Sequence, residues 1–417
     1  MMKVCIHRGT QEVGGTCIEI ESQGKRIALD VGLPLDAADS IESLPQVDGF
    51  RERHESLLAV VISHSHLDHY GLARYLLPDT QMIMGAATES ILKAATLFTP
   101  TGMEFSNVLH LDPGKALSIG PFTITPYLND HSAYDAYSLL ISADGQRLFY
   151  SGDFRGHGRK ATVFERFLKR PPSAVDVLLM EGTTIGRSGA EAKFKTEQEL
   201  EQCFLEHIDD SKGMVLVWTS GQNIDRLVTV FKACKKSGRQ LVLDMYTAEI
   251  LRMTGNLNLP QAEWKGVKVF LPDSQRRQIK KNQQFKLAER YKPYRVYPKQ
   301  LAVEAARSVL LFRPSMVRDL EKAECLQDAK LIYSLWPGYL KREEHRSFHK
   351  WLDKRSILLV HCHTSGHASP QDLQRFAKAI APKMLVPIHS FATKRFKEYF
   401  DNVEMKKDGQ WWEVPHD

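Results

Sequence analysis

Four side chains that can bind a metal ion fall within six residues of this chain. They are His64, His66, Asp68 and His69, in the sequence VVISHSHLDHY that runs from Val60 to Tyr70. Imidazole and carboxylate groups together suit zinc, and manganese is the alternative where oxygen ligands dominate. A polar turn that happens to be rich in histidine would be the plainer interpretation. The H-x-H-x-D-H spacing directly after an apolar run favours a metal site instead.

The elements around this motif would place it at the end of a strand. The apolar run from Leu57 to Ile62 predicts a buried strand. After the motif, Leu72, Tyr75 and Leu76 have the spacing of one apolar side of a helix. The metal ligands would then lie in a loop at the carboxyl end of a strand, where open α/β sheets usually place their sites.

Composition and length set limits on the class of protein. The 417 residues are 43% hydrophobic and 25% charged, with a formal net charge of +6. This length predicts two or three domains, and no stretch is apolar enough to span a membrane. The N-terminal sequence lacks the apolar core of a signal peptide. The six cysteines are scattered without a C-x-x-C pair, which predicts reduced, buried thiols and no disulfide. We therefore expect a cytoplasmic protein without a membrane partner.

The metal motif is the signature of the metallo-β-lactamase superfamily, and the chain resembles that superfamily along nearly its whole length. The resemblance implies an α/β fold, the αββα sandwich. It also implies that His131, Asp153 and His389, each of which follows a predicted strand, complete the ligand set. Taken alone, His131 would be an ordinary polar loop residue. Asp30, which ends another predicted strand, is expected to orient the metal loop from behind the ligands.

A long insertion narrows the resemblance to one branch. More than 170 residues separate Glu181 from the next histidine-rich strand end. The β-CASP branch, whose members are nucleic-acid-processing nucleases, carries a domain at this place, and the sequences around His367 and His389 resemble its motifs. The insert alternates predicted strands and helices, which favours a mostly parallel sheet. We expect a metallo-β-lactamase domain over residues 1–189, a β-CASP insert over 190–355 and a return segment of the first domain over 356–417.

Carried over residue by residue, the resemblance implies two divalent metal ions, most simply Zn²⁺, with Mn²⁺ as the alternative. A hydroxide bridging the two ions would attack a phosphodiester bond. His367 is expected to act as general acid, assisted by Glu181, and Asp68 is expected to serve both as ligand and in catalysis. The implied ligands are His64, His66 and His131 for one ion, Asp68, His69 and His389 for the other, and Asp153 for both.

A strongly basic stretch indicates a nucleic-acid partner. Residues 273–300 hold nine lysines or arginines and two acids, a net charge of +7 that exceeds the charge of the whole chain. Tyrosines lie between the basic residues, and positive charge with aromatic rings suits single-stranded nucleic acid. A solvated basic helix is the alternative. The expected substrate contacts are Ser65, His363, Ser365, Arg276, Arg277, Lys280 and Lys281.

Two other segments are open between a phosphate contact and an ordinary structural role. Arg155, His157 and Arg159 follow Asp153 and form either a phosphate contact or a solvated basic loop. Residues 219–223 open a predicted helix, whose free N–H groups could hold a phosphate or could simply be capped.

The function implied by the resemblance is that of a metal-dependent ribonuclease acting on single-stranded RNA. RNA-processing members of the branch usually carry histidine where His389 stands, whereas DNA-repair members usually carry valine. The chain resembles ribonuclease J and cleavage-factor-like nucleases, and with 28 residues after His389 it is expected to lack the C-terminal domain of ribonuclease J. A DNA nuclease, a non-catalytic nucleic-acid-binding protein and a small-substrate metallohydrolase are the alternatives. Exonuclease or endonuclease mode and assembly as a homo-oligomer are not determined by the sequence.

Overall fold

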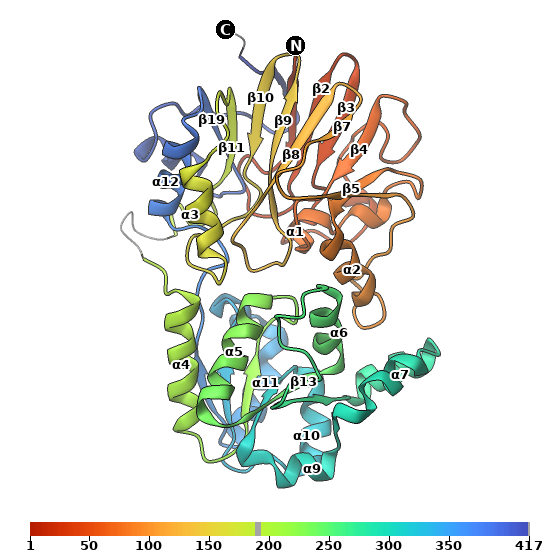
Figure 1. Ribbon diagram of the computed structural model, residues 1–417, viewed down its shortest axis with the longest axis vertical. Coiled ribbons are helices and arrows are strands. Elements are labelled where there is room, and N and C mark those ends of the chain that lie inside the picture. The colour runs from red at the N-terminus through yellow and green to blue at the C-terminus, as the bar shows by residue number, and fades with distance from the viewer. Residues whose placement is uncertain (188–192, 416–417) are drawn as a thin grey trace. The chain divides into compact units, whose positions relative to one another are not determined.

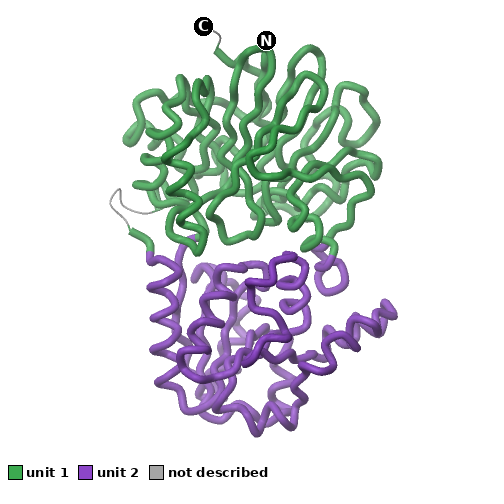
Figure 2. The backbone as a smooth tube through the Cα atoms, viewed as in Figure 1, with its two compact units in different colours: residues 1–93, 103–194, 366–417 green, residues 94–102, 195–365 purple. Residues whose placement is uncertain are grey.

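The computed structural model describes residues 1–187 and 193–415, so the predicted domain boundary between residues 189 and 190 lies outside the described residues. The chain divides into two compact units (Figure 2). Unit 1 consists of Met1–Lys93, Met103–Phe194 and Gly366–Asp417, and unit 2 consists of Ala94–Gly102 and Lys195–Ser365. Within the described ranges, no helix combines the length and the apolar character needed to cross a bilayer.

Unit 1 is built on two sheets (Figure 1). The first has the strand order β20-β1-β2-β3-β4-β5-β6, and the second has the order β19-β11-β10-β9-β8-β7. The strands of the first sheet are β1 (Lys3–Arg8), β2 (Cys17–Ser22), β3 (Lys25–Leu29), β4 (Leu57–Val61), β5 (Met82–Gly85), β6 (Val108–Leu111) and β20 (Trp411–Glu413). Those of the second are β7 (Leu117–Ile119), β8 (Phe122–Leu128), β9 (Tyr137–Ala143), β10 (Gln146–Tyr150), β11 (Val177–Glu181) and β19 (Met384–Ile388).

Three apolar clusters hold unit 1 together. Alternate residues of a strand face opposite sides of a sheet, so each sheet contributes one face to the core between the two sheets, which includes Val61 and Leu179. The outer face of the first sheet packs with Tyr70 and Leu92, and that of the second packs with Phe376 and its neighbours. These contacts form the αββα sandwich, so the predicted fold class is confirmed. The helices involved are α1 (Leu67–Tyr70), α2 (Ala86–Ala95), α3 (Ala161–Lys169) and α12 (Pro370–Ile380).

The helix predicted after the metal motif, around Leu72–Leu76, is only a short 3-10 turn in the structure. Helix α1 ends at Tyr70, and only Ala73–Tyr75 forms a further 3-10 turn. The cause is hydrogen bonding to the segment after β3. Val31 N donates to the His69 carbonyl over 2.8 Å, and Leu72 N donates to the Val31 carbonyl over 3.0 Å. The backbone groups that would continue the helix are therefore used to fix the metal loop.

Unit 2 contains a seven-stranded sheet in the order β15-β14-β13-β16-β12-β17-β18, and every neighbouring pair is parallel. The predicted mostly parallel sheet is thus confirmed, and Thr196 and Glu199 form a capping box at the start of α4. The strands are β12 (Val215–Trp218), β13 (Gln240–Asp244), β14 (Val267–Phe270), β15 (Arg295–Val296), β16 (Ser308–Leu311), β17 (Lys330–Tyr333) and β18 (Leu358–His361). The helices are α4 (Glu197–Asp209), α5 (Ile224–Ser237), α6 (Met245–Met253), α7 (Asp273–Lys281), α8 (Phe285–Tyr291), α9 (Pro298–Val303), α10 (Val317–Ala323) and α11 (Arg346–Lys354).

The predicted boundary at residue 355 requires a correction. The strand expected just after it is β18, and β18 pairs with β17 of the insert, with Leu359 opposite Leu331. Unit 2 therefore continues to Ser365, ten residues beyond the predicted boundary at residue 355. A local apolar pattern identifies a strand but not the sheet that it joins, which depends on its pairing partner.

The prediction of six reduced cysteines is also wrong for two of them. Cys203 in α4 and Cys362 after β18 form a disulfide, with their Cα atoms 6.3 Å apart. The other four cysteines are free and buried. Because 159 residues separate the bonded pair in the sequence, no short spacing pattern could reveal it.

Candidate metal centre

The second sheet of unit 1 brings four strand ends to one edge. Strands β8, β10, β11 and β19 run in the same direction, because β9 is antiparallel to both β8 and β10, and β11 is parallel to β10 and β19. His131 follows β8, Asp153 follows β10, and His389 follows β19, while Glu181 is the last residue of β11. The loop with the metal motif follows β4 of the first sheet and completes the group.

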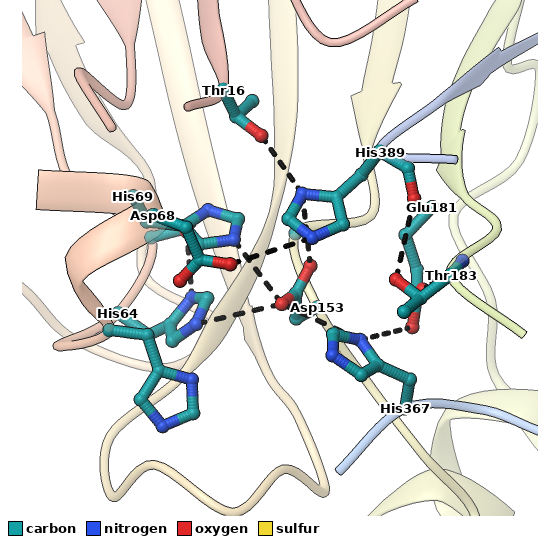
Figure 3. Close-up of polar contacts among 12 residues, drawn as sticks. Thr16, His64, Asp68, His69, Asp153, Glu181, Thr183, His367 and His389 are labelled. Carbon is teal, nitrogen blue, oxygen red and sulfur yellow. Dashed lines mark hydrogen bonds and ion pairs between the residues drawn. The ribbon is translucent and has the colours of Figure 1, made fainter. Parts of the chain in front are cut away.

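The seven predicted ligands form two groups that share Asp153, and Figure 3 shows the aspartate between them. Within each group, one ligand atom from every residue lies within 4.8 Å of the others. Asp153 Oδ2 is 3.2 Å from His69 Nε2 and 3.8 Å from His64 Nε2. Ligand atoms that surround one tetrahedral zinc ion at about 2.1 Å would be about 3.4 Å apart. The two groups are His64, His66, His131 and Asp153, and Asp68, His69, Asp153 and His389.

Buried polar atoms at the centre test whether cations fit there. Among the described residues, His64 Nε2, His389 Nε2 and Asp153 Oδ1 are buried and have no hydrogen-bond partner. Leaving such an atom buried and unsatisfied costs about 1–3 kcal/mol. His64 belongs to one ligand group, His389 to the other and Asp153 to both, and imidazole nitrogen and carboxylate oxygen are the donors a divalent cation needs. The residues present therefore fit divalent metal binding.

Asp30 holds the metal loop from behind, as the sequence predicted. It is fully buried and accepts hydrogen bonds from the amide and the hydroxyl of Ser63, each over 2.7 Å. It also accepts from the hydroxyl of Tyr150 over 2.5 Å and from His69 Nδ1 over 2.7 Å. With Nδ1 donating to Asp30, Nε2 of His69 faces Asp153. Burial lowers the pKa of His69, but the charges of Asp153 and Asp30 outweigh it and raise that pKa well above the ordinary histidine value, so a metal ion would replace the proton on Nε2.

Sequence reasoning missed three supporting residues. Thr16 Oγ1 lies 3.0 Å from His389 Nδ1 (Figure 3), and Ser63 Oγ lies 3.0 Å from His64 Nδ1. Both contacts leave Nε2 of the histidine facing the centre. Tyr150 is the third, through Asp30. Ser63 could have been suspected from its place beside His64, but nothing in the local sequence marks Thr16, which is 373 residues from its partner.

The electrostatics keep most of the imidazoles neutral. Burial, together with neighbouring imidazoles, lowers the pKa of His64 and of His131 well below the ordinary histidine value. Burial likewise lowers the pKa of His66 to about 4. Since a neutral imidazole is the form that binds metal, these shifts prepare the three histidines of the first group as ligands.

His367 stands beside this centre and contacts two carboxylates. Its Nδ1 is 3.4 Å from Glu181 Oε1 and 3.6 Å from Asp153 Oδ2. Burial lowers the pKa of His367, but the charges of Glu181 and Asp153 outweigh it and raise that pKa to about 9. Glu181 is itself held in place, since the amide of Thr183 donates to its Oε2 over 3.0 Å. The ring therefore tends to carry a proton next to the two metal groups.

The predicted substrate contacts lie in several places. Ser65 is buried within the metal loop. His363 and Ser365 are at the end of unit 2. The four basic residues lie on α7, where Arg276 and Arg277 form ion pairs with Asp273. None of the seven belongs to either of the two ligand groups that share Asp153 in this centre. The basic contacts are Arg276, Arg277, Lys280 and Lys281.

One residue of each open segment has a structural role. Arg155 is fully buried, and its guanidinium lies 3.7 Å from the Asp130 carboxylate, so for this residue the solvated basic loop is wrong. Asn223 caps α5 by accepting a hydrogen bond from Arg226 N over 3.0 Å.

Comparison with known proteins agrees with this geometry. Residues 35–204 match the Beta-lactamase superfamily domain. Ribonuclease J of Sinorhizobium meliloti is 23% identical over 365 residues, which cover 84% of this chain and 60% of that protein. Ribonuclease J of Helicobacter pylori (strain 26695) is 22% identical over 396 residues, covering 91% of this chain and 55% of the relative. The chain thus spans less than two thirds of the length of these relatives.

Two further similarities extend the comparison. The transcription termination factor FttA of Methanothermobacter thermautotrophicus is 28% identical over 217 residues, which cover 46% of this chain and 33% of that protein. A solved structure of a protein of unknown function from Enterococcus faecalis V583 superposes with a TM-score of 0.79 at 21% identity, covers 99% of each chain, and so shares the fold. The domain match over residues 35–204, the histidine–aspartate centre and these relatives all support the resemblance to the β-CASP branch of the metallo-β-lactamase superfamily.

Proposed function

We propose that this protein is a metal-dependent ribonuclease that hydrolyses phosphodiester bonds of single-stranded RNA. The observation that carries the proposal is the pair of ligand groups that share Asp153, with the His367–Glu181 pair beside them. A metal site alone would serve many hydrolases. A site for two cations with a proton donor at its edge suits a reaction in which an attacking and a leaving oxygen must both be stabilised.

Two divalent ions are the proposed cofactor, with Zn²⁺ first and Mn²⁺ as the alternative. His64, His66 and His131 would hold one ion, and the second group would hold the other, with Asp153 between them. Ions about 3.5–4 Å apart would supply a water of lowered pKa and charge stabilisation for an in-line displacement. The chain's own part is to fix the ligands, through Asp30 behind His69 and through Thr16 behind His389.

His367 is the proposed general acid. The pKa of about 9 means that its ring is protonated at neutral pH. Cations bound to Asp153 would oppose that residue's share of the shift, so Glu181 is the carboxylate that continues to favour the protonated ring. The proton from His367 would pass to the leaving oxygen of the ribose as the phosphodiester bond breaks. Glu181 would then act as a positioning residue, because it orients the ring and is itself fixed by the amide of Thr183.

The substrate class follows from charge and from the relatives. The relatives named ribonuclease J favour RNA. The basic helix α7 would contact the phosphate backbone, chiefly through Lys280 and Lys281, because Arg276 and Arg277 already pair with Asp273. Ser65, His363 and Ser365 are further proposed substrate contacts.

The test is a single-turnover cleavage assay with a 5′-labelled single-stranded RNA and the DNA of the same sequence. The protein is first stripped of metal and then supplied with Zn²⁺ or Mn²⁺. Cleavage of RNA that returns with metal supports the proposal. Better cleavage of DNA would replace it with a DNA nuclease, and no metal-dependent cleavage of either strand would refute a nuclease.

Two variants assign the roles. Asp153→Ala should abolish cleavage and reduce bound metal, because both ligand groups lose a member. His367→Ala should slow cleavage by about 10²–10⁴-fold while metal stays bound, as expected for loss of a general acid. His110→Ala is the matched control, since His110 is half exposed on β6 and belongs to neither ligand group. Metal loss from His367→Ala would show that this histidine is a ligand rather than the acid.

A further inference from the structure

A third cluster of metal-binding side chains lies in unit 2, outside the centre described above. Cys203, His207 and Cys362 each offer one ligand atom, and these atoms lie within 4.8 Å of one another. Cys203 and His207 are one turn apart on α4, so they point to the same side of the helix. Cys362 follows β18 and is buried. In the structure the two sulfurs form the disulfide.

The same three side chains have the chemistry of a zinc site once the disulfide is reduced. Two thiolates and one imidazole are common zinc ligands, and a site with three protein ligands keeps its fourth position for water. No hydrogen bond to the ring of His207 is found in the described part of the chain.

The cluster joins the first and the last segments of the insert. Helix α4 begins two residues after the chain enters unit 2 at Lys195, and Cys362 lies three residues before the chain leaves it at Ser365. Thr364, two residues after Cys362, donates a hydrogen bond from Oγ1 to the Lys195 carbonyl over 2.6 Å and so also joins these two segments. A bond or an ion at this cluster therefore ties together the two segments through which the insert is connected.

We propose that Cys203, His207 and Cys362 form a redox-gated zinc site, which binds one Zn²⁺ when the cysteines are reduced and releases it when they form the disulfide. This site is separate from the proposed nuclease centre, and its existence does not depend on that activity. Disulfides of proteins in a reducing compartment are usually transient or redox-sensing, which fits a pair that has a second use.

The two states interconvert by thiol–disulfide exchange. A dithiol reductant passes two electrons and two protons to the Cys203–Cys362 bond, giving two protein thiols and the cyclic disulfide of the reductant. Zinc binding then releases the two thiol protons. In the reverse direction, two protein thiolates and one glutathione disulfide give the Cys203–Cys362 bond and two glutathione thiolates, and the ion leaves because both sulfur ligands are consumed.

Cobalt titration of the full chain tests the site. The protein is reduced with a phosphine, freed of reductant and titrated with Co²⁺ without oxygen. Thiolate ligands give a charge-transfer absorption in the near ultraviolet that histidine and carboxylate ligands do not give, so the nuclease centre does not interfere. We expect this band to saturate at one thiolate-bound cobalt per chain, and to vanish when glutathione disulfide is added.

Substitutions identify the residues that produce the charge-transfer absorption. Cys203→Ser should remove at least half of the absorption, and His207→Ala should weaken cobalt binding by more than about tenfold, since losing a ligand costs at least as much as losing an outer partner of one. Cys234→Ser is the matched control, because Cys234 is a buried free cysteine of α5, and it should leave the band unchanged. A reduced wild-type protein with both thiols titratable but without the band would overturn the proposal, as would a full band in Cys203→Ser. The wild-type measurement stands even if a variant fails to fold.

Discussion

Replacing Asp30 by asparagine should weaken metal binding although Asp30 touches no metal ligand other than His69. Its backbone has a φ of +57°, a left-handed conformation that asparagine tolerates better than most residues, so Asp30→Asn adds little backbone strain. The side chain keeps its shape and loses its charge. The four hydrogen bonds that Asp30 accepts come from Ser63, Tyr150 and His69.

The magnitude follows from those donors. Asparagine presents an NH₂ group where one carboxylate oxygen stood, and an NH₂ group cannot accept a hydrogen bond. In one orientation it opposes the Ser63 amide, and in the other it opposes Tyr150 and His69. Either way the metal loop loses a support and the His69 tautomer is less firmly set. Loss of such an outer partner typically costs about 10–100-fold in metal affinity, or about 1.4–2.7 kcal/mol.

The assay is competition for Zn²⁺ between the protein and a chromophoric chelator, which requires no catalysis. Asp176→Asn is the matched control, because Asp176 is a buried aspartate of the same unit that accepts the Arg147 amide over 2.7 Å and lies outside both ligand groups. The control should bind zinc like the wild type. A dissociation constant for Asp30→Asn within about threefold of the wild type would refute the reasoning that outer partners set this affinity.

Three other outcomes are expected. Glu197→Ala should lower the free energy of unfolding of unit 2, measured in urea, by about 3–5 kcal/mol, because it leaves the fully buried guanidinium of Arg226 without its carboxylate partner. The control Glu206→Ala, on the exposed side of α4, should change this free energy little. Removing Lys280 and Lys281 together should reduce the salt dependence of RNA binding by about 0.7 in slope per lysine if both contact phosphates, measured with a cleavage-deficient protein; an unchanged slope would exclude them. Zinc at about 100 times its dissociation constant should stabilise unit 1 by about 2.7 kcal/mol against thermal unfolding, and a melting temperature insensitive to zinc would contradict binding to the folded centre.

Local patterns were enough to predict most elements and the metal loop. Strand β4 at Leu57–Val61 appears where the apolar run from Leu57 to Ile62 predicts it, because a buried strand reads as a continuous apolar run. The metal motif was visible because its ligands are neighbours in sequence. His131 carries no such signal, since a single histidine after a strand is common, and only the resemblance to a family singled it out. The structure then brings it within the group of His64 and His66.

The features that escaped prediction all depend on partners distant in sequence. Strand β18 was assigned to the wrong domain because its partner, β17, is fixed by the packing of the insert. The disulfide joins residues 159 positions apart, and Thr16 meets His389 across 373 positions. The helix predicted after the motif is reduced to a 3-10 turn because hydrogen bonds to Val31 replace those of a continuous helix. The periodicity of apolar residues shows which side of a segment is buried, but it does not identify the segment that packs against that side.

The metal centre also joins segments that are distant in sequence, which gives it a role in stability. The second ligand group takes Asp68 and His69 from the loop after β4 in the first sheet, and Asp153 and His389 from strand ends of the second. A cation held by all four would cross-link the two sheets, and opening the sandwich would break its coordination. Metal binding and packing of the core between the sheets should therefore be coupled. The core substitution Leu179→Ala should weaken zinc affinity, because it leaves a cavity under the strand ends that position Glu181 and Asp153. A similar cavity made in unit 2, by Leu216→Ala, should leave zinc affinity at the metal centre of unit 1 unchanged.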